Sequence, residues 1–167
     1  LITTTGDKPG FVFFSNEIKD YIKPSGGQKH FSRFADYISN PENYGNASDL
    51  KKGFGFLINY VSRAIESVIL VSDFIGFRDT MKTDLSFIAN KFETTMLMIR
   101  DPLDNTLPDF AGEIVAEDPK TGQQLLMNPK VAKKMYEALA REQEQSVRDV
   151  CRSNNVDLLE MMTDQPF

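Results

Sequence analysis

The sequence is poor in the residues on which most enzyme and metal centres depend. Its 167 residues include one cysteine, one histidine and no tryptophan. A single cysteine excludes a disulfide framework and a cysteine-rich zinc site, and one histidine without spaced partners makes no catalytic triad. The sequence also has no GxxxxGK[ST], GxGxxG, HExxH or GxSxG motif. The best-defined signatures of nucleotide-binding proteins, metalloproteases and serine hydrolases are therefore absent.

Positive charge and long apolar runs are also scarce. Lys and Arg number 19 against 24 Asp and Glu, which gives a net charge of −5. A nucleic-acid-binding surface needs clustered Lys and Arg, so we expect no nucleic-acid partner. No apolar run reaches the roughly 18 residues of a membrane span, and residues 1–10 have neither region of a signal peptide. We therefore expect a soluble, cytoplasmic protein of about one domain.

The spacing of apolar residues predicts an α/β domain. Strands are predicted at 11–14, 17–22, 68–71, 96–99 and 156–162, and helices at 28–39, 50–61, 79–92 and 129–151. The strand at 17–22 follows the first after Ser15-Asn16, which favours an antiparallel edge strand. A hairpin insertion is predicted near 113–127, around a turn with Pro and Gly. Apolar strands alternating with helices indicate a sheet covered on both faces.

Polar side chains follow the ends of two predicted strands. Asp73 comes directly after the run at 68–71, Arg100 and Asp101 come after 96–99, and Ser48 and Asp49 begin a helix. In open α/β sheets ligands bind at the carboxyl ends of strands, and oxygen ligands suit Mg²⁺. The alternative is structural: Ser48 caps the helix, Asp73 pairs with helix N-termini, and Arg100 with Asp101 forms a surface ion pair. The spacing leaves both alternatives open.

Three further features have ordinary structural explanations. We expect His30 to be a surface or capping residue, and Cys151 to behave as a small apolar side chain late in a helix. The segment from Lys130 to Arg152 mixes acidic and basic residues, which is typical of a solvated helix face. A partner surface on this helix remains an open alternative.

The order of short motifs along the chain resembles the bacterial domain of unknown function 58 family. The motifs are Gly6-Asp7-Lys8, Gly26-Gly27-Gln28-Lys29-His30, Ser48-Asp49-Leu50, Leu70-Val71-Ser72-Asp73-Phe74, Arg100-Asp101-Pro102, Leu107-Pro108-Asp109, Asp118-Pro119-Lys120-Thr121-Gly122 and Thr163-Asp164-Gln165-Pro166-Phe167. The resemblance spans the whole chain, 1–167, as a single domain. It implies a von Willebrand factor A-like fold, which is a Rossmann-like three-layer sheet, mostly parallel, with an antiparallel edge strand.

Domains of this fold commonly carry a metal-ion-dependent adhesion site (MIDAS) at the carboxyl edge of the sheet. A DxSxS motif after the central first strand supplies three ligands, and a later Thr and a later Asp complete the site. By similarity, Ser48 stands in the place of the Thr and Asp73 in the place of the Asp, with Asp49, Arg100 and Asp101 as a partner-binding rim. Nothing in the chain supplies DxSxS. The resemblance therefore implies that the first strand and helix are missing and that Mg²⁺ binds only together with that motif.

A missing central strand would leave backbone groups of its neighbours unpaired, which is costly. The strands at 11–14 and 68–71 would flank the gap. Either they pair directly, or a second copy fills the gap by a strand swap in a homodimer.

The resemblance implies a noncatalytic protein-interaction module linked to MoxR-type AAA+ ATPases in chaperone function or complex assembly. A Mg²⁺ in the intact site would bridge to an acidic side chain of the partner. The alternative is a Mg-dependent hydrolase or phosphatase that uses Asp49, Asp73 and Asp101 as a strand-end acidic cluster. The sequence offers this enzyme no convincing nucleophile or general base. A third alternative keeps the fold and has lost the site.

Overall fold

The computed structural model describes residues 6–44, 48–109, 114–117 and 122–165. It is a mixed α/β protein, as the sequence predicts, and it divides into two compact units. Unit 1 comprises residues 1–65 and 80–91, and unit 2 comprises residues 66–79 and 92–167.

Unit 1 begins with an antiparallel hairpin covered by one helix. Strands β1 (Phe11–Phe14) and β2 (Ile18–Ile22) pair antiparallel, and helix α1 (Gln28–Ser39) follows. Aromatic rings join the helix to β1: Phe11 stacks on Phe34 with ring centroids 3.8 Å apart, and Phe13 stacks on Tyr37 at 4.0 Å. Such pairs add to the burial of apolar area, so α1 is held by the ring faces of the hairpin. The antiparallel pairing predicted for 17–22 is confirmed.

The rest of unit 1 is helical. After the 3-10 turn η1 (Pro41–Asn43) come α2 (Leu50–Tyr60), the turn η2 (Asp79–Met81) at the unit boundary and α3 (Lys82–Lys91). The ammonium group of Lys91 donates to the carbonyl oxygens of Leu57, Ile58 and Val61, at 3.1, 2.8 and 2.6 Å. These carbonyls lie at the C-terminal end of α2, where a helix leaves acceptors without intrahelical partners. Lys91 therefore fastens the end of α3 to the end of α2.

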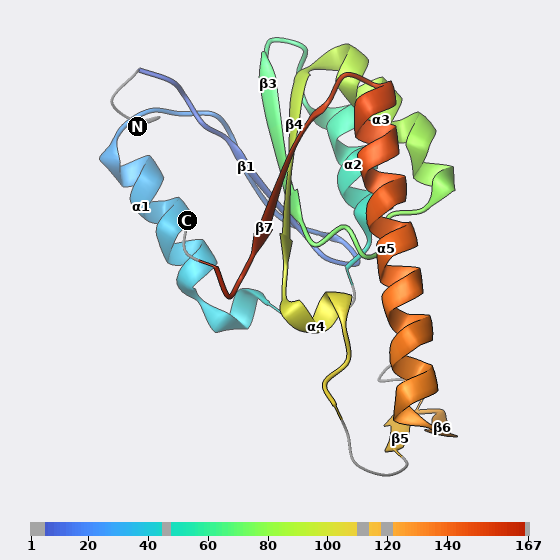
Figure 1. Cartoon of the computed structure of the whole chain (residues 1–167). Coiled ribbons are helices and arrows are strands. Elements are labelled where there is room, and N and C mark those ends of the chain that lie inside the picture. The colour runs from blue at the N-terminus through green and yellow to red at the C-terminus, as the bar shows by residue number, and fades with distance from the viewer. Residues whose placement is uncertain (1–5, 45–47, 110–113, 118–121, 166–167) are drawn as a thin grey trace. The chain divides into compact units, whose positions relative to one another are not determined.

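Unit 2 contains a parallel sheet in the order β3-β4-β7. Its strands are β3 (Ser67–Ser72), β4 (Glu93–Arg100) and β7 (Asp157–Met162), and the 25-residue helix α5 (Pro129–Ser153) runs beside them in Figure 1. The buried residues of β4 alternate, because successive side chains point to opposite faces of a strand. The buried apolar residues of the strands and of α5 are Leu70, Met96, Met98, Val147, Val150 and Cys151. One face of the sheet is thus packed on the last turns of α5.

The other face of this sheet carries apolar side chains that remain exposed. Ile69, Val71 and Leu159 are 60%, 53% and 58% exposed. Val71 and Leu159 both pair in register with Leu97 of β4, so they lie on the same face. The prediction of a strand at 68–71 buried on both sides is therefore wrong for Ile69 and Val71. Within unit 2, α5 covers one face of the sheet. Successive side chains of a strand point to opposite faces, so Ile69 and Val71 point to the face that α5 does not cover.

The remaining elements of unit 2 are short. Helix α4 (Pro102–Asn105) follows β4, and strands β5 (Ile114–Glu117) and β6 (Gln124–Met127) pair antiparallel as the predicted hairpin. Residues 118–121 of its turn lie outside the described residues, and Gly122 has a positive φ of 69° that favours glycine. Helix α4 is too short to give a periodic pattern in the sequence and was not predicted.

The described strands form three separate sheets, β1-β2, β3-β4-β7 and β5-β6. The parallel and antiparallel parts of the expected sheet are thus present as separate pieces. The single-domain arrangement and the missing central strand stay predictions. In the part of the chain that the structure describes, no helix is long and apolar enough to cross a membrane.

Two glycines of α2 offer a matched pair of substitutions. A Cβ added to Gly53 would lie 3.0–3.1 Å from ring atoms of Phe14, whereas one added to Gly55 would meet nothing within 4 Å. Gly55→Ala should therefore stabilise the protein by about 0.5–1 kcal/mol through helix propensity. Gly53→Ala should lose this gain to the ring contact and destabilise by about 1 kcal/mol. Urea unfolding measures both, and equal stabilisation by the two would contradict the close packing of α2 on Phe14.

Cys151 is a buried thiol with a measurable pH signature. It is 2% exposed, its Sγ lies 3.4 Å from the Sδ of Met96, and burial raises its pKa from 9.0 to about 11. These facts confirm the small apolar residue that the sequence predicts. Between about pH 9 and 11 the unfolded chain loses the thiol proton while the folded protein keeps it, so stability falls as the pH rises through this window.

We expect this thiol to remove on the order of 2 kcal/mol of stability across that window. Urea unfolding at pH 8, 9, 10 and 11 should show the fall in the native protein. The Cys151→Ala variant lowers stability at every pH by creating a cavity, but lacks the contribution of the thiol to the slope. Parallel pH curves for the two proteins would contradict the buried thiol.

Candidate functional site

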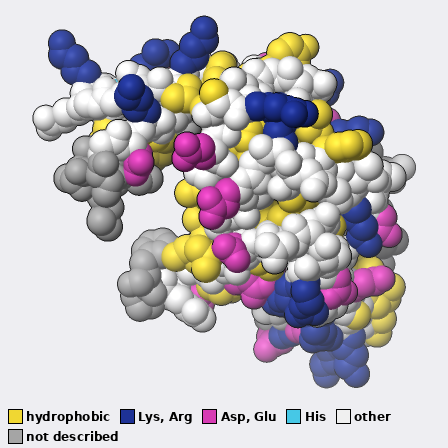
Figure 2. Space-filling model, turned by 90° about the horizontal axis from the view of Figure 1, so that it is seen from above, with side chains coloured by type: hydrophobic (Ala, Val, Ile, Leu, Met, Phe, Trp, Pro, Cys, Tyr) yellow, Lys and Arg dark blue, Asp and Glu magenta, His cyan; other side chains and the backbone are white. Residues whose placement is uncertain are grey.

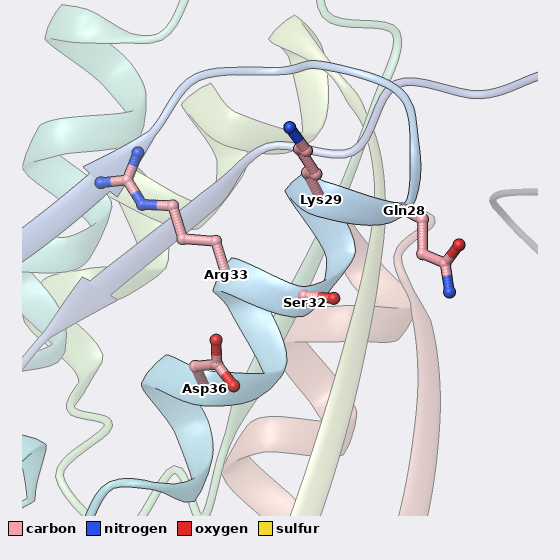
Figure 3. A pocket seen from close by; sticks show the side chains of 5 residues that line it. All are labelled: Gln28, Lys29, Ser32, Arg33 and Asp36. Carbon is pink, nitrogen blue, oxygen red and sulfur yellow. The ribbon is translucent and has the colours of Figure 1, made fainter.

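A hollow on the surface of α1 does not form an enclosed site. It has a volume of about 450 Å³ and is lined by Gln28, Lys29, Ser32, Arg33 and Asp36. All five belong to one face of α1, and Figure 3 shows their side chains diverging from the helix. A ligand site converges on its ligand with groups from several elements. This surface is therefore the polar face of a helix.

The candidate site that the structure does assemble lies at the carboxyl end of β4 and centres on Arg100. The residue is 2% exposed. Its Nε donates to the carbonyl oxygen of Asp73 at 3.1 Å, and its Nη1 lies 3.4 Å from both Asn105 Oδ1 and Glu144 Oε1. Its Nη2 donates to Gln143 Oε1. The guanidinium thus has acceptors from the end of β3, from α4 and from α5.

The period of β4 explains why this arginine is inside. Arg100 lies on the same face as Met96 and Met98, which pack towards α5. A buried guanidinium is always charged, and its burial costs free energy unless acceptors surround it. Gln143 extends the arrangement, since its Nε2 donates to the carbonyl oxygen of Phe74. The cluster therefore ties α5 to the loop that follows β3.

A second arginine continues the same network on α5. Arg148 donates from Nε and Nη2 to Glu160 at 2.7 and 3.0 Å, and from Nη2 to Glu144 at 3.3 Å. The hydrogen bond that Arg148 donates to Glu160, together with the negative charges of Glu160 and Glu144, raises the pKa of Arg148. Glu144 is thus shared by Arg100 and Arg148. The charges of Arg100, Arg148, Glu144 and Glu160 are thus paired with one another within unit 2, which suits a structural role.

Asp73 shapes the turn after β3. Asp73 is exposed. Its Oδ1 accepts from the backbone N–H of Ile75 at 3.0 Å and from the Ser72 hydroxyl at 3.3 Å. The next residue, Phe74, is 0% exposed and has a positive φ of 53°. An aspartate that accepts from the N–H two residues on holds a tight turn. The carboxylate is therefore a turn residue with its other oxygen available.

Asp101 caps the short helix α4. Its Oδ1 accepts from the N–H of Leu103 at 2.9 Å, Asp104 accepts in return from the N–H of Asp101, and the Thr163 hydroxyl donates to Oδ2 at 3.1 Å. This is a capping box. The alternative of a surface ion pair between Arg100 and Asp101 is wrong, because Arg100 is buried and bonds to other groups. Burial also takes Arg100 out of an exposed partner-binding rim.

Ser48 and Asp49 belong to unit 1. Asp49 is the N-cap of α2: its Oδ1 accepts from the N–H of Lys51 at 3.0 Å, and its own N–H donates to the Ser15 carbonyl at 3.0 Å. The cap expected at Ser48 is therefore one residue too early. Ser48 itself is exposed.

The described residues do not by themselves make a metal centre. No three His, Cys, Asp or Glu side chains gather around one point in the described ranges. Ser48 and Asp49 belong to unit 1, and Asp73 and Asp101 belong to unit 2. Mg²⁺ requires near-octahedral oxygen coordination. Two such side chains do not fit that requirement without further ligands.

His30 is half-buried and does not cap α1, so the expected surface or capping position is wrong, although its role is structural. Its Nε2 lies 2.6 Å from the carbonyl oxygen of Pro9, and its ring centroid lies 5.6 Å from that of Phe11. A carbonyl only accepts, so Nε2 carries the proton. The histidine fastens α1 to the segment before β1. Gln143 and Glu144, by contrast, were missed as partners of Arg100, because residues 43 and 44 positions away leave no local spacing signal.

The Arg100 cluster makes a clear stability prediction. Arg100→Ala takes from Glu144, Gln143, Asn105 and the Asp73 carbonyl the buried guanidinium that they accept from, and should cost about 3–5 kcal/mol. Arg100→Lys keeps the charge but not the planar fork, and should restore less than half of the loss. The control is Arg152→Ala on α5, the helix that carries Gln143 and Glu144. The Arg152 side chain is 79% exposed, so this change should alter stability by less than about 1 kcal/mol. Urea unfolding compares them, and equal losses at the two positions would refute the cluster.

Comparison with known proteins gives a family and a fold. A family profile described as "Protein of unknown function DUF58" matches residues 1–146. No curated protein matches the chain.

Two solved structures resemble the chain. The conserved hypothetical protein BatB from Bacteroides thetaiotaomicron has a TM-score of 0.51 at 10% identity, over 95% of this chain and 72% of that one. An aerotolerance-related membrane protein from Bacteroides fragilis, with multiple mutations to serines, has a TM-score of 0.47 at 9% identity, over 89% and 79%. Identities this low show likeness of fold alone.

Proposed function

Because the chain belongs to the DUF58 family of proteins of unknown function, we propose a function from its own residues: it is a noncatalytic protein-interaction module. The observation that carries the proposal is the exposed apolar face of the β3-β4-β7 sheet. Ile69, Val71 and Leu159 are each more than half exposed on it. Figure 2 shows hydrophobic side chains reaching the surface among charged ones. Contiguous exposed apolar side chains mark interaction surfaces.

The polar residues at the strand ends support the noncatalytic part of the proposal. Arg100 donates hydrogen bonds to four acceptors within the protein, and Asp101 caps α4. Asp49 caps α2 in the other unit. A catalytic acid or base must reach a substrate with its proton-carrying atom. Groups already engaged in caps and a buried cluster suit a structural role better.

A von Willebrand factor A-like architecture, with Mg²⁺ bridging to an acidic side chain of a partner, is a finer part of the proposal. The outer edge of β3 has no partner among the described strands, and a further strand would pair there. Asp73 follows β3 directly with an exposed carboxylate, and by family resemblance Ser48 is its co-ligand. The remaining ligands would come from a DxSxS motif that the chain does not contain.

The proposed partner is a MoxR-type AAA+ ATPase, which the family resemblance implies. Binding of the protein to the ATPase of the same organism should be measurable by surface plasmon resonance. We expect Val71→Lys and Leu159→Lys each to weaken it at least tenfold, because a charge would have to be buried in an apolar interface. The control is Phe87→Lys in unit 1, where Phe87 is 59% exposed. Equal effects at all three positions, or no binding by the native protein, would contradict this partner and surface.

The metal part is tested on an N-terminally longer form of the protein by calorimetric titration with Mg²⁺. Asp73→Asn and Ser48→Ala should each weaken binding at least tenfold, because each removes one oxygen ligand of a hard cation. Asp157→Asn is the control, since this exposed aspartate begins β7 at the opposite end of the sheet. If the longer form binds no divalent ion, the proposed metal bridge is wrong, whereas the proposed apolar interaction surface is not contradicted.

A further inference from the structure

The first half of α5 carries an apolar stripe that nothing in the described chain covers. Val131, Met135 and Leu139 are 58%, 63% and 63% exposed. Residues four apart lie on the same side of a helix, so the three form one line about 12 Å long at 1.5 Å per residue. Glu142 follows on this side and ends the stripe. Half of the longest helix thus presents an unpartnered apolar line.

Three cations run along one side of this stripe. Lys130, Lys134 and Arg141 are all exposed, and at 100° per residue they fall within a narrow sector of the helix. None of them makes an ion pair with any part of the chain that the structure describes. Other cations of α5 are paired: Lys133 with Asp109 at 2.7 Å and Arg148 with Glu160. The unpaired cations are therefore those beside the apolar stripe.

The other side of the stripe adjoins the protein itself. Tyr136 is half-buried, and its hydroxyl donates to the carbonyl oxygen of Leu103 at 2.8 Å. The free surface is therefore narrow, with apolar side chains on the side towards Tyr136 and positive charge on the opposite side. A helix lying on a bilayer needs a broad apolar face with cations flanking it and large apolar or aromatic residues. A narrow, one-sided stripe fits a single helix better than a membrane surface.

We infer that the Val131–Met135–Leu139 stripe and its basic edge bind an acidic amphipathic helix of a partner protein. The partner helix would place apolar residues at i, i+3 or i+4 and i+7 against the stripe, and its carboxylates against Lys130, Lys134 and Arg141. Met135 at the centre suits such a role, because its flexible thioether adapts to different apolar partners. The inference deepens the proposed function by giving a second surface and the chemistry of what it binds, and it rests on that function.

The test uses two fluorescent helical peptides of about 18 residues, five turns at 3.6 residues per turn. Both carry Leu along one face; one has Glu along a flank and the other has Lys at the same positions. Fluorescence anisotropy with the protein should show that the Glu peptide binds at least tenfold more tightly than the Lys peptide. The difference should shrink at high salt, which screens exposed charges.

Matched variants locate the binding. Lys130→Glu/Lys134→Glu should weaken the Glu peptide at least tenfold, while Lys51→Glu/Lys52→Glu, an equal charge change on two exposed residues of unit 1, should change it less than twofold. Met135→Asp should abolish binding. All these positions are exposed, and circular dichroism verifies that each variant folds. No binding of either peptide, equal binding of both, or equal effects of the two charge reversals would overturn the inference.

Two further outcomes are informative. Co-sedimentation with phosphatidylcholine–phosphatidylglycerol vesicles that is lost in the Met135→Asp and Lys130→Glu/Lys134→Glu variants, without peptide binding, would replace the partner helix with a membrane. Intact binding to the ATPase in a protein whose α5 stripe binds no acidic peptide would overturn this surface alone. The failure of the stripe and the failure of the proposed function are thus separated.

Discussion

The burial of the Arg100 guanidinium is the constraint on which unit 2 depends. A permanently charged group inside a protein needs acceptors in several directions. Here they come from the carbonyl of Asp73 after β3, from Asn105 in α4, and from Gln143 and Glu144 in α5. These elements have to meet at one point for the cluster to form. The cluster therefore fixes the position of α5 on the sheet together with the path of the chain after β3 and after β4.

The same constraint explains what is left for function. The carboxyl edge of a parallel sheet is where α/β proteins commonly bind ligands, and in unit 2 it is largely occupied by the Arg100 cluster and the Asp101 cap. The groups that remain available are mostly apolar, on the open face of the sheet and along the first half of α5. An apolar surface with charge along one edge is typical of a protein-binding surface and not of a catalytic site.

Much of the local structure was predictable because it depends on residues close in sequence. The strand at 11–14, the helix at 28–39 and the long helix after Asn128-Pro129 follow from periodicity and capping. The errors lie where contacts between distant residues decide. Arg100 next to Asp101 suggests a surface ion pair, yet its partners come from the turn after β3, from α4 and from α5. Ser48 and Asp49 are both good caps, and Asp49, whose N–H donates to the Ser15 carbonyl, is the one that caps α2.

By itself, the sequence determined that the protein is α/β, that it lacks the GxxxxGK[ST], GxGxxG, HExxH and GxSxG motifs, and which family it belongs to. Hydrophobic periodicity, residue types and motif order are properties of the chain alone. Only the tertiary structure decided which polar groups are engaged in hydrogen bonds within the fold and which apolar side chains stay exposed. Ile69 and Leu70, for example, are neighbouring apolar residues, and only Leu70 is buried. Leu70 pairs in register with Met96, so it lies on the face where Cys151 of α5 contacts Met96, and residues distant in sequence decide that this face is the covered one.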